Sequence, residues 1–328
     1  MRVFGINYDT GFTSGGSTTH EPFDPEVVRR DLRVIREELR CDAVRITGGV
    51  PDRLELAAGL AAEVGLEVWY CPFTNGLDRA GLRAFLLDGA ERAEKLRVAG
   101  ARVVYLTGSE ISLFTDGFVP GGRPDFTDLA ALRAAIPAAQ AAVRAFFAEL
   151  VPQVRARFGG PVGYASVPLE AVDWAPFDIV ASDGGYRDAS NAASFPLTLA
   201  AAVGQGKPYA ATEFGCCTFR GAGDVAGKPE PVTYGPDGRA VALTAELERD
   251  EEGQARYVVE LLRDYEAGGV EAAFVYTFAN RHLPTTEDPA RDFDLAARGI
   301  VRVLPDGSWT PKAAFRALAV YGAERAAK

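Results

Sequence analysis

The sequence predicts a single (β/α)8 barrel, of the α/β class, that occupies residues 1–328. Eight short, β-rich apolar runs each end in polar or turn-forming residues, and amphipathic segments rich in Ala, Leu and Arg lie between them. The composition, 48% hydrophobic and 24% charged, suits a globular protein with a large core. The number of strand–helix repeats favours a closed parallel barrel in one domain.

The eight predicted strands are short apolar segments of the kind that fits a half-buried or buried sheet. In chain order they are Val3–Tyr8, Ala43–Thr47, Glu67–Pro72, Val103–Glu110, Val162–Val167, Asp178–Asp183, Pro208–Phe214 and Ala272–Phe278. In a parallel barrel all carboxyl ends lie at one rim, so the polar residues that end these runs are expected to meet there.

Helices are predicted where apolar residues recur at three- and four-residue steps, as Val28, Leu32 and Ile35 do in Pro25–Leu39. Asp24 is expected to cap that helix, with proline in its first turn. The other predicted helices are Arg53–Val64, Leu82–Val98, Leu129–Arg157 (interrupted at Pro137 and Pro152), Ala192–Val203, Arg249–Glu266 and Pro311–Tyr321.

A doubly wound open sheet is the alternative fold, because it also alternates strands with helices. That fold usually carries a glycine-rich phosphate loop after an early strand. Here Gly15-Gly16 is followed by Ser, Thr and His, and no such loop is present. The barrel is therefore the favoured prediction.

Three connections that follow predicted strands are longer than barrel closure needs, and loops at that rim build the active face of a barrel. They extend over Ile111–Asp128, Phe214–Glu248 and Ala279–Ile300, after strands 4, 7 and 8. Within the second, a Pro-Asp-Gly turn lies between two short apolar stretches. A β-hairpin insertion near residues 230–245 is expected over the barrel mouth.

The formal net charge of −10 argues against a nucleic-acid partner, which needs clustered Lys and Arg, and against an anionic membrane. The first residues are strand-like, without the apolar core of a signal peptide, and no stretch that spans a membrane stands out. Cytoplasmic residence is the resulting expectation. The oligomeric state cannot be read from the sequence.

The four cysteines, Cys41, Cys71, Cys216 and Cys217, have no CxxC spacing. With only two histidines in the chain, a structural zinc site is hard to assemble. The cysteines are expected to be reduced thiols that pack as small buried side chains. No metal and no cofactor are expected.

Two predicted strands end in a glutamate: the fourth in Glu110 and the seventh in Glu213. A carboxylate at the end of an apolar strand is costly to place without partners or a task. Two carboxylates that face each other across a barrel mouth can flank a sugar, one donating a proton to the glycosidic oxygen and the other attacking the anomeric carbon. A glycosidase is the function that this pair favours.

At this point the chain resembles the retaining glycoside hydrolases of the 4/7 superfamily, or clan GH-A, which are (β/α)8 barrels with catalytic glutamates at the ends of strands 4 and 7. The resemblance implies that Glu110 is the general acid/base and Glu213 the nucleophile. It covers barrel topology and strand-end motifs, with no closely matched subfamily. The chain also resembles uncharacterised actinobacterial proteins sometimes labelled abortive-infection proteins, although none of these residues explains a phage-defence activity.

The resemblance also implies supporting residues. Arg45, at the end of the second predicted strand, matches an arginine that lies against the nucleophile and would lower its pKa, while Glu110 needs a raised pKa. Tyr186 matches a tyrosine that donates a hydrogen bond to the nucleophile. Asp183, at the end of the sixth strand, is the alternative charged group there, and either residue could be the functional one.

The chain departs from the superfamily pattern at two positions. Ser109 stands where an asparagine usually binds the sugar 2-hydroxyl, so the contact at that position and the identity of the sugar are open. The eighth strand lacks the tryptophan on which the sugar usually stacks. Tyr276 or Phe278 could replace it, and either could equally be a core aromatic.

Further polar residues are expected at the same rim. Asn7 and Asp9 end the first strand, and His20 and His282, in the first and eighth loops, would be neighbours in a closed barrel. The histidines could bind sugar hydroxyls or a metal, or be loop residues without a role.

Three functions remain open. The first is a retaining glycosidase, or a transglycosylase with the same intermediate, that acts on a small glycoside or oligosaccharide without a cofactor. The second is a metal-dependent sugar isomerase or epimerase, with Glu110, Asp183, Glu213 and His282 as ligands. The third is a barrel that binds a carbohydrate or protein without turnover.

Overall fold

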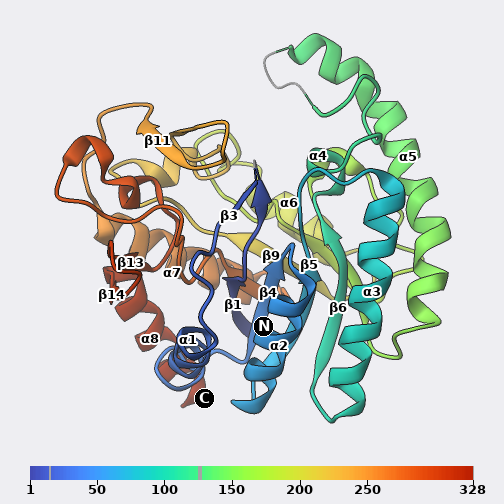
Figure 1. Ribbon diagram of the computed structural model, residues 1–328, viewed down its shortest axis with the longest axis horizontal. Helices are drawn as coiled ribbons and strands as arrows, with labels where there is room; N and C mark the ends of the chain where they lie inside the picture. Colours follow the sequence, from blue (N-terminus) through green and yellow to red (C-terminus); the bar gives the residue numbers. More distant parts are fainter. Residues whose placement is uncertain (15, 125–127, 328) are drawn as a thin grey trace.

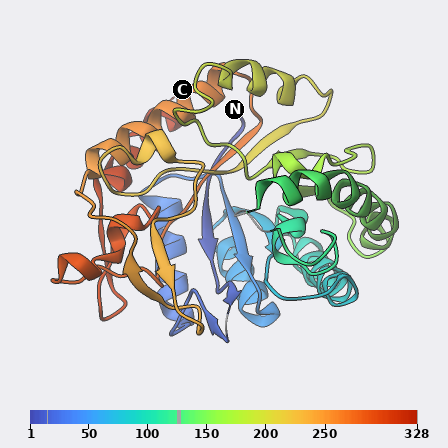
Figure 2. The ribbon, with the colours of Figure 1, turned by 90° about the horizontal axis from the view of Figure 1, so that it is seen from above.

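The computed structural model describes residues 1–14, 16–124 and 128–327. Eight parallel strands close into a barrel, because the last strand, β12, pairs with the first, β1 (Figures 1 and 2). They are β1 (Val3–Asp9), β4 (Ala43–Gly48), β5 (Glu67–Pro72), β6 (Val103–Ser109), β7 (Val162–Ser166), β8 (Val180–Ser182), β9 (Tyr209–Phe214) and β12 (Ala272–Val275). The predicted barrel is confirmed and the open sheet is excluded.

The side chains of each strand alternate between the barrel interior and the helix layer, as the two-residue period of a strand requires. The lower interior is filled by small and aromatic side chains, with Trp69 packed on Phe274 at 4.7 Å between ring centroids. In β1, Phe4 and Ile6 join the core under the helices, whereas Asn7 reaches the interior. The same alternation brings Arg45 of β4 into the barrel, where it is fully buried. Polar groups therefore occupy the interior above an apolar floor.

The helices surround the barrel in Figure 2 and pack apolar side chains against it. They are α1 (Pro25–Glu37), α2 (Pro51–Glu63), α3 (Arg79–Val98), α4 (Ile111–Phe114), α5 (Leu129–Arg155), α6 (Phe195–Val203), α7 (Glu251–Ala267) and α8 (Ala313–Ala326). All except the short α4 overlap segments predicted to be helical. The side chain of Asp24 accepts a hydrogen bond from the Glu26 amide and caps α1, as expected.

Helix α5 differs from its prediction, because it continues through Pro137 and Pro152 without interruption. Its segment Ala130–Arg155 is long and apolar enough to cross a membrane by length and composition alone. In the barrel its inner face packs against strands and neighbouring helices through buried side chains that include Val143 and Phe147. One third of its most apolar 18-residue window is buried in this way.

One repeat lacks its α-helix. Strands β7 and β8 are joined by the 3-10 turn η1 (Pro168–Glu170) and irregular chain, so the strict strand–helix alternation is broken there. The other 3-10 turns are η2 (Ala222–Val225), η3 (Pro289–Arg291) and η4 (Phe293–Ala296).

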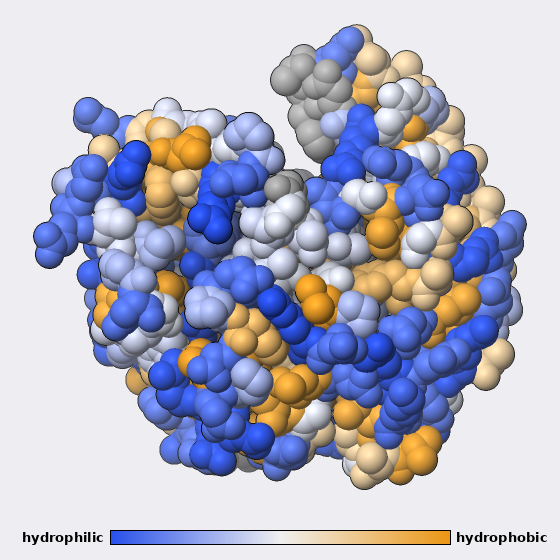
Figure 3. Space-filling view, viewed as in Figure 1, coloured by the Kyte–Doolittle hydropathy of each residue, from blue (hydrophilic) through white to orange (hydrophobic). Residues whose placement is uncertain are grey.

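Small two-stranded sheets lie outside the barrel sheet. They are β2 (Thr13–Ser14) with β3 (Ser17–Thr18), β10 (Val232–Tyr234) with β11 (Ala240–Leu243), and β13 (Val301–Val303) with β14 (Trp309–Pro311). The pair β10–β11 lies where the sequence predicts a hairpin, and Ser17 donates a hydrogen bond to the carbonyl of Asp237 in its turn, at 2.6 Å. Figure 3 shows the surface hollowed between the β10–β11 region and the projecting end of α5.

The four cysteines are free and buried, in agreement with their prediction as small core side chains. Cys71 also contacts a charged side chain inside the barrel, since its Sγ accepts a hydrogen bond from Arg45 at 3.5 Å. Burial raises the pKa of the Cys71 thiol to about 11, which keeps it protonated at neutral pH.

Candidate active site

Three carboxyl groups meet at the carboxyl ends of β6, β8 and β9. One oxygen from each of Glu110, Asp183 and Glu213 lies within 4.8 Å of the other two. Asp183 is 1% exposed and Glu213 is 9% exposed, so two of these acids are almost removed from solvent. Like charges so close cannot all be ionised without a cation or a shared proton.

Arg45 supplies that cation from β4. Its guanidinium donates to Glu213 Oε1 at 2.7 Å and to Asp183 Oδ2 at 3.2 Å, and a further nitrogen–oxygen contact to Asp183 Oδ1 measures 3.1 Å. It also donates to the side-chain oxygen of Asn7 at 3.0 Å. One guanidinium therefore holds two carboxylates in a fixed fork geometry, but its single charge balances only one of them.

Asp183 and Ser109 are bound to each other. The Ser109 hydroxyl donates to Asp183 Oδ2 at 2.5 Å, and both side chains are buried. Because its hydroxyl hydrogen is committed in this way, Ser109 offers a ligand only its acceptor lone pairs. The departure from asparagine at this position is thus accompanied by an acid at the end of β8.

Glu110 is fixed through its backbone. It has a left-handed conformation, with φ of 46°, at the start of α4. The next two amides are held by buried side chains, because the Ile111 amide donates to the Tyr164 hydroxyl at 2.9 Å and the Ser112 amide donates to Glu170 at 3.0 Å. The Tyr164 hydroxyl in turn donates to Glu170 at 2.7 Å. This network maintains a backbone conformation that is unfavourable for a glutamate.

The carboxyl group of Glu110 makes no hydrogen bond or ion pair within the described part of the chain. Burial raises its pKa well above the ordinary value, and the charges of Asp183, Glu213 and Glu170 raise it further, while Arg45 opposes them. The surroundings of Glu110 therefore favour the protonated form of its carboxyl group.

Burial and the charge of Asp183 raise the pKa of Glu213 to about 8, against the opposing effect of Arg45 and its hydrogen bond. Arg45 lowers this pKa, as expected, but the effect of burial is larger, so the net pKa of Glu213 is raised. Because Arg45 binds Glu213 and not Glu110, it stabilises the carboxylate form of Glu213 more than that of Glu110.

A cavity of about 400 Å³ opens beside Glu213. Its wall comes from β1, β4, β9, α4, the β10–β11 hairpin and the residues that follow β5 and β12. It is lined by Asp9, Phe12, Thr19, Thr47, Phe73, Phe114, Glu213, Glu230, Tyr234, Gly235, Pro236, Gly238, Tyr276, Thr277, Asn280 and His282. Three of these phenyl rings contact one another, with Phe12 at 4.7 Å from Phe73 and 5.2 Å from Phe114 between centroids. The cavity joins an apolar wall to convergent polar groups, which is the usual character of a small-molecule site.

The comparisons with known proteins concern this barrel as a whole. No family model and no curated protein matches the chain, so nothing supports the resemblance to proteins labelled abortive-infection proteins. Among solved structures, a GH113 β-1,4-mannanase matches with a TM-score of 0.65 and 16% identity, over 99% of this chain and 100% of its own. The GH113 β-mannanase AaManA from Alicyclobacillus acidocaldarius matches with a TM-score of 0.63 and 15% identity, over 98% and 97%.

A β-glucuronidase from Parabacteroides merdae is also similar, with a TM-score of 0.60 and 14% identity over 98% of this chain and 36% of the enzyme. The likeness is one of fold. It agrees with the barrel that the strand-end motifs imply, and the roles of individual residues rest on the geometry of this chain.

The structure places the remaining predicted residues at different depths. Asn7 is buried behind the site, where it also donates to the Thr212 carbonyl at 2.8 Å, so it supports Arg45 and the strand before Glu213. Asp9 and His282 line the cavity. His20 is 1% exposed, and its Nδ1 lies 2.9 Å from the Asp9 carbonyl, so it is a buried residue and not an exposed loop histidine.

The aromatic candidates divide in the same way. The Tyr186 hydroxyl lies 3.5 Å from Glu213 Oε2, at the limit of a hydrogen bond. Tyr276 lines the cavity. Phe278 is fully buried between Tyr8 and Trp309, at 6.1 and 5.4 Å between centroids, so of its two alternatives it is a core aromatic and not a sugar platform.

Several residues of the site were not predicted. Glu230 lines the cavity and pairs at 2.9 Å with Arg298, which also stacks over Tyr186, at 4.9 Å from the ring centroid. Both lie in the long loops after β9 and β12, where no periodic pattern marks a residue as important. Glu170 follows the fifth strand in a proline-led turn, and an acid next to an apolar strand was the available signal.

The three carboxyl groups are close enough to share a metal ion, and within the described residues His282 is not part of that group. Arg45 already donates to two of the three acids and brings its own positive charge to them. A divalent ion at the same place would face that guanidinium at close range. The residues present therefore fit an arginine-centred carboxylate cluster better than a metal centre.

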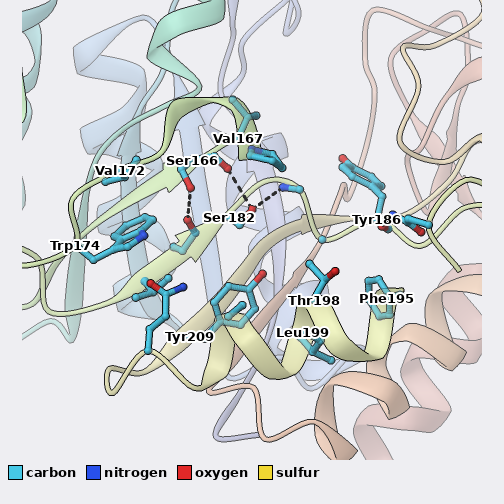
Figure 4. A pocket seen from close by; sticks show the side chains of 18 of the residues that line it. Ser166, Val167, Val172, Trp174, Ser182, Tyr186, Phe195, Thr198, Leu199 and Tyr209 are labelled. Carbon is cyan, nitrogen blue, oxygen red and sulfur yellow. Dashed lines mark hydrogen bonds between the residues drawn. The ribbon is translucent and has the colours of Figure 1, made fainter. Parts of the chain in front are cut away.

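A second cavity, of about 330 Å³, lies outside the barrel, where the helix between β7 and β8 is missing (Figure 4). Trp174, Tyr209 and Leu199 contribute to its wall, and Ser166 and Ser182 form hydrogen bonds to neighbouring backbone carbonyls. Neither Glu110 nor Glu213 lines it. The acids of the barrel mouth make that region the candidate active site.

Proposed function

We propose that this protein is a retaining glycoside hydrolase that acts on a small glycoside or oligosaccharide. The observation that carries the proposal is the pair of glutamates at the barrel mouth, in which one carboxyl oxygen of each lies within 4.8 Å of the other, and Arg45 binds only Glu213 of the two. Retaining glycosidases place their two carboxyl groups about 5–5.5 Å apart, whereas inverting enzymes leave about 6.5–9.5 Å for a water molecule. The similar folds of GH113 mannanases and a β-glucuronidase support the same class of reaction.

In the first step, Glu110 donates its proton to the glycosidic oxygen while Glu213 attacks the anomeric carbon. The bond from the anomeric carbon to the leaving oxygen breaks, and a bond to Glu213 Oε forms. The protonated leaving group departs as an alcohol. Glu110 is then a carboxylate, and it accepts a proton from the incoming water, whose oxygen displaces Glu213 and restores both groups. A sugar hydroxyl in place of water gives transglycosylation.

The surrounding residues serve these steps. Arg45 holds one oxygen of Glu213 in place and favours its ionised form. The network of Tyr164 and Glu170 orients the peptide that carries Glu110. No step requires a cofactor, and the partner of the protein is a small carbohydrate rather than a nucleic acid.

The proposal is tested with aryl glycosides of the common sugars in both anomeric forms, and with their 2-deoxy-2-fluoro analogues. Turnover of at least one glycoside is expected, with a loss of about 10⁴-fold or more in Glu213→Gln, because the nucleophile is removed. The fluoro sugar should add its mass to Glu213 as a covalent ester. Glu248→Gln is the matched control, since Glu248 is an exposed carboxylate paired with Arg220 away from the cavity.

Two results would overturn the proposal. One is unchanged turnover in Glu213→Gln. The other is an absence of hydrolysis across the whole panel together with no covalent label, which would favour a barrel that binds carbohydrate without cleaving it.

A further inference from the structure

The cavity beside Glu213 is lined by acids and by no base of the lysine or arginine type within the described residues. Asp9, Glu213 and Glu230 contribute carboxyl groups to its wall, and His282 is the remaining ionisable nitrogen group there. Burial lowers the pKa of His282, so that its ring is neutral at pH 7. Its Nδ1 is buried and has no hydrogen-bond partner among the described residues, so the ring adds no positive charge to the wall.

The guanidinium groups behind the wall are already engaged. Arg45 is bound to Glu213, Asp183 and Asn7. Arg298 is bound to Glu230 at 2.9 Å and donates to the carbonyls of Ala226 and Lys228, at 2.8 and 2.5 Å. An anionic ligand in the cavity would have to displace one of these contacts to find a cation.

The charges of the region do not cancel. The acids in and behind the wall are Asp9, Glu110, Asp183, Glu213 and Glu230, and the bases are Arg45 and Arg298. Even with Glu110 and Glu213 protonated, three carboxylates face two guanidinium groups. One net negative charge is left in a poorly hydrated place, where it acts on a ligand at short range.

The cavity also has a definite place in the proposed reaction. Its wall includes Glu213 but not Glu110. The nucleophile contacts the sugar whose anomeric carbon reacts, whereas the acid lies next to the leaving group. The cavity is therefore the place of the glycone, the sugar on the non-reducing side of the cleaved bond.

We infer that this cavity selects its glycone by charge, and accepts a neutral or an amino sugar while it rejects a uronic acid. The inference rests on the proposed function only in calling the bound sugar a glycone. The charge preference itself is a property of binding and does not depend on turnover. It concerns the reacting sugar alone. An adjoining cavity of about 400 Å³, which shares Phe12 and His282, contains Arg239 and Arg281 and lies beyond this wall.

The test compares three 4-nitrophenyl β-glycosides that differ in glycone charge: the glucoside, the 2-amino-2-deoxyglucoside and the glucuronide. Dissociation constants are measured by saturation-transfer NMR titration with Glu110→Gln, which slows turnover and leaves the cavity wall intact. The glucuronide should bind about tenfold or more weaker than the glucoside, and the amino sugar at least as tightly as the glucoside. The difference should shrink with added salt.

A second substitution, Glu230→Gln, removes one wall charge and loosens Arg298. It should narrow the gap between glucoside and glucuronide by at least about threefold, whereas Glu248→Gln should leave the gap unchanged. Glucuronide binding equal to or tighter than glucoside binding, or a gap that Glu230→Gln does not alter, would overturn the inference.

The outcomes separate this inference from the proposed function. The charge order, with neither hydrolysis nor covalent label across the full panel, would overturn the proposed function alone. Hydrolysis of glycosides without the charge order would overturn this inference alone. If none of the three glycosides binds, this inference is overturned, while the proposed function is still decided by the full panel of aryl glycosides.

Discussion

The two glutamates of the barrel mouth are held in opposite ways. Glu213 is held at its carboxyl group, because Arg45 donates a hydrogen bond to its Oε1 at 2.7 Å. Glu110 is gripped at its backbone, by way of Tyr164 and Glu170, and its carboxyl group has no protein partner among the described residues. In the proposed reaction, the nucleophile benefits from a fixed, charged carboxylate, and the acid/base benefits from a carboxyl group that starts out protonated. The difference teaches that two identical side chains can receive distinct roles from their surroundings.

The largest effect is expected from Arg45→Met, which removes the ion pair with Glu213 and leaves two buried acids without their cation. Breaking a buried ion pair in this way costs about 3–5 kcal/mol of folding free energy. The loss should be greatest at alkaline pH and shrink as pH falls, because protonation relieves the uncompensated charges. Urea unfolding at pH 5 and pH 9 measures it, with Arg45→Lys as the variant that keeps the charge without the fork. An equal loss of unfolding free energy at both pH values would show that Arg45 stabilises the fold through packing alone and not through its charge.

The second prediction concerns the pH dependence of kcat/KM. Glu213 must be ionised to attack, and its pKa is raised to about 8, so activity should fall as pH decreases through that value. Glu110 must be protonated, and its pKa is also raised, so activity should fall again at higher pH. The expected profile is a bell on the alkaline side of neutrality. An acidic limb near the ordinary pKa of glutamate would contradict the assigned surroundings of Glu213.

The third prediction separates position from charge at Glu110. Glu170→Gln weakens the turn and removes a negative charge, so kcat should fall by about 10-fold to 100-fold and the alkaline limb should move to lower pH. Tyr164→Phe weakens the same turn but keeps the charge, so kcat should fall without that movement. The pH profile of kcat distinguishes the two variants. A lower kcat with the same alkaline limb in both would reduce Glu170 to a structural residue.

The smallest effect is expected from Tyr186→Phe. Its hydroxyl lies 3.5 Å from Glu213, and a hydrogen bond of this length contributes at most about 0.5–1 kcal/mol, or a few-fold in kcat/KM. Kinetic constants on the best aryl glycoside measure the change. A loss of a hundredfold or more in kcat/KM would show that Tyr186 contacts the bound substrate, beyond its weak hydrogen bond to Glu213.

Much of the fold was predictable because it depends on local patterns. The eight apolar runs correspond to the eight barrel strands, and Asp24 and Pro25 mark the start of α1. The prolines of α5 misled the prediction, since the helix continues through Pro137 and Pro152 while its inner face packs on the barrel. A tertiary contact outweighs a local penalty in this case.

The site was predictable where side chains follow a strand end and not where they depend on a loop. Glu110, Asp183 and Glu213 could be found from sequence because parallel strands present their ends at one rim. Glu230 and Arg298 could not, because the long loops that carry them have no period. The sequence left Phe278 open between a sugar platform and a core aromatic, because a strand-end aromatic faces either the mouth or the helix layer, and only the packing decides which.

The sequence by itself determined the kind of architecture and the two glutamates at its rim, since both follow from the order of strands and the residues that end them. Only the tertiary structure decided how those glutamates differ. A pKa depends on burial and on charges within a few ångströms, and Arg45, Asp183 and Glu170 reach the two sites from strands and turns that are distant in the chain.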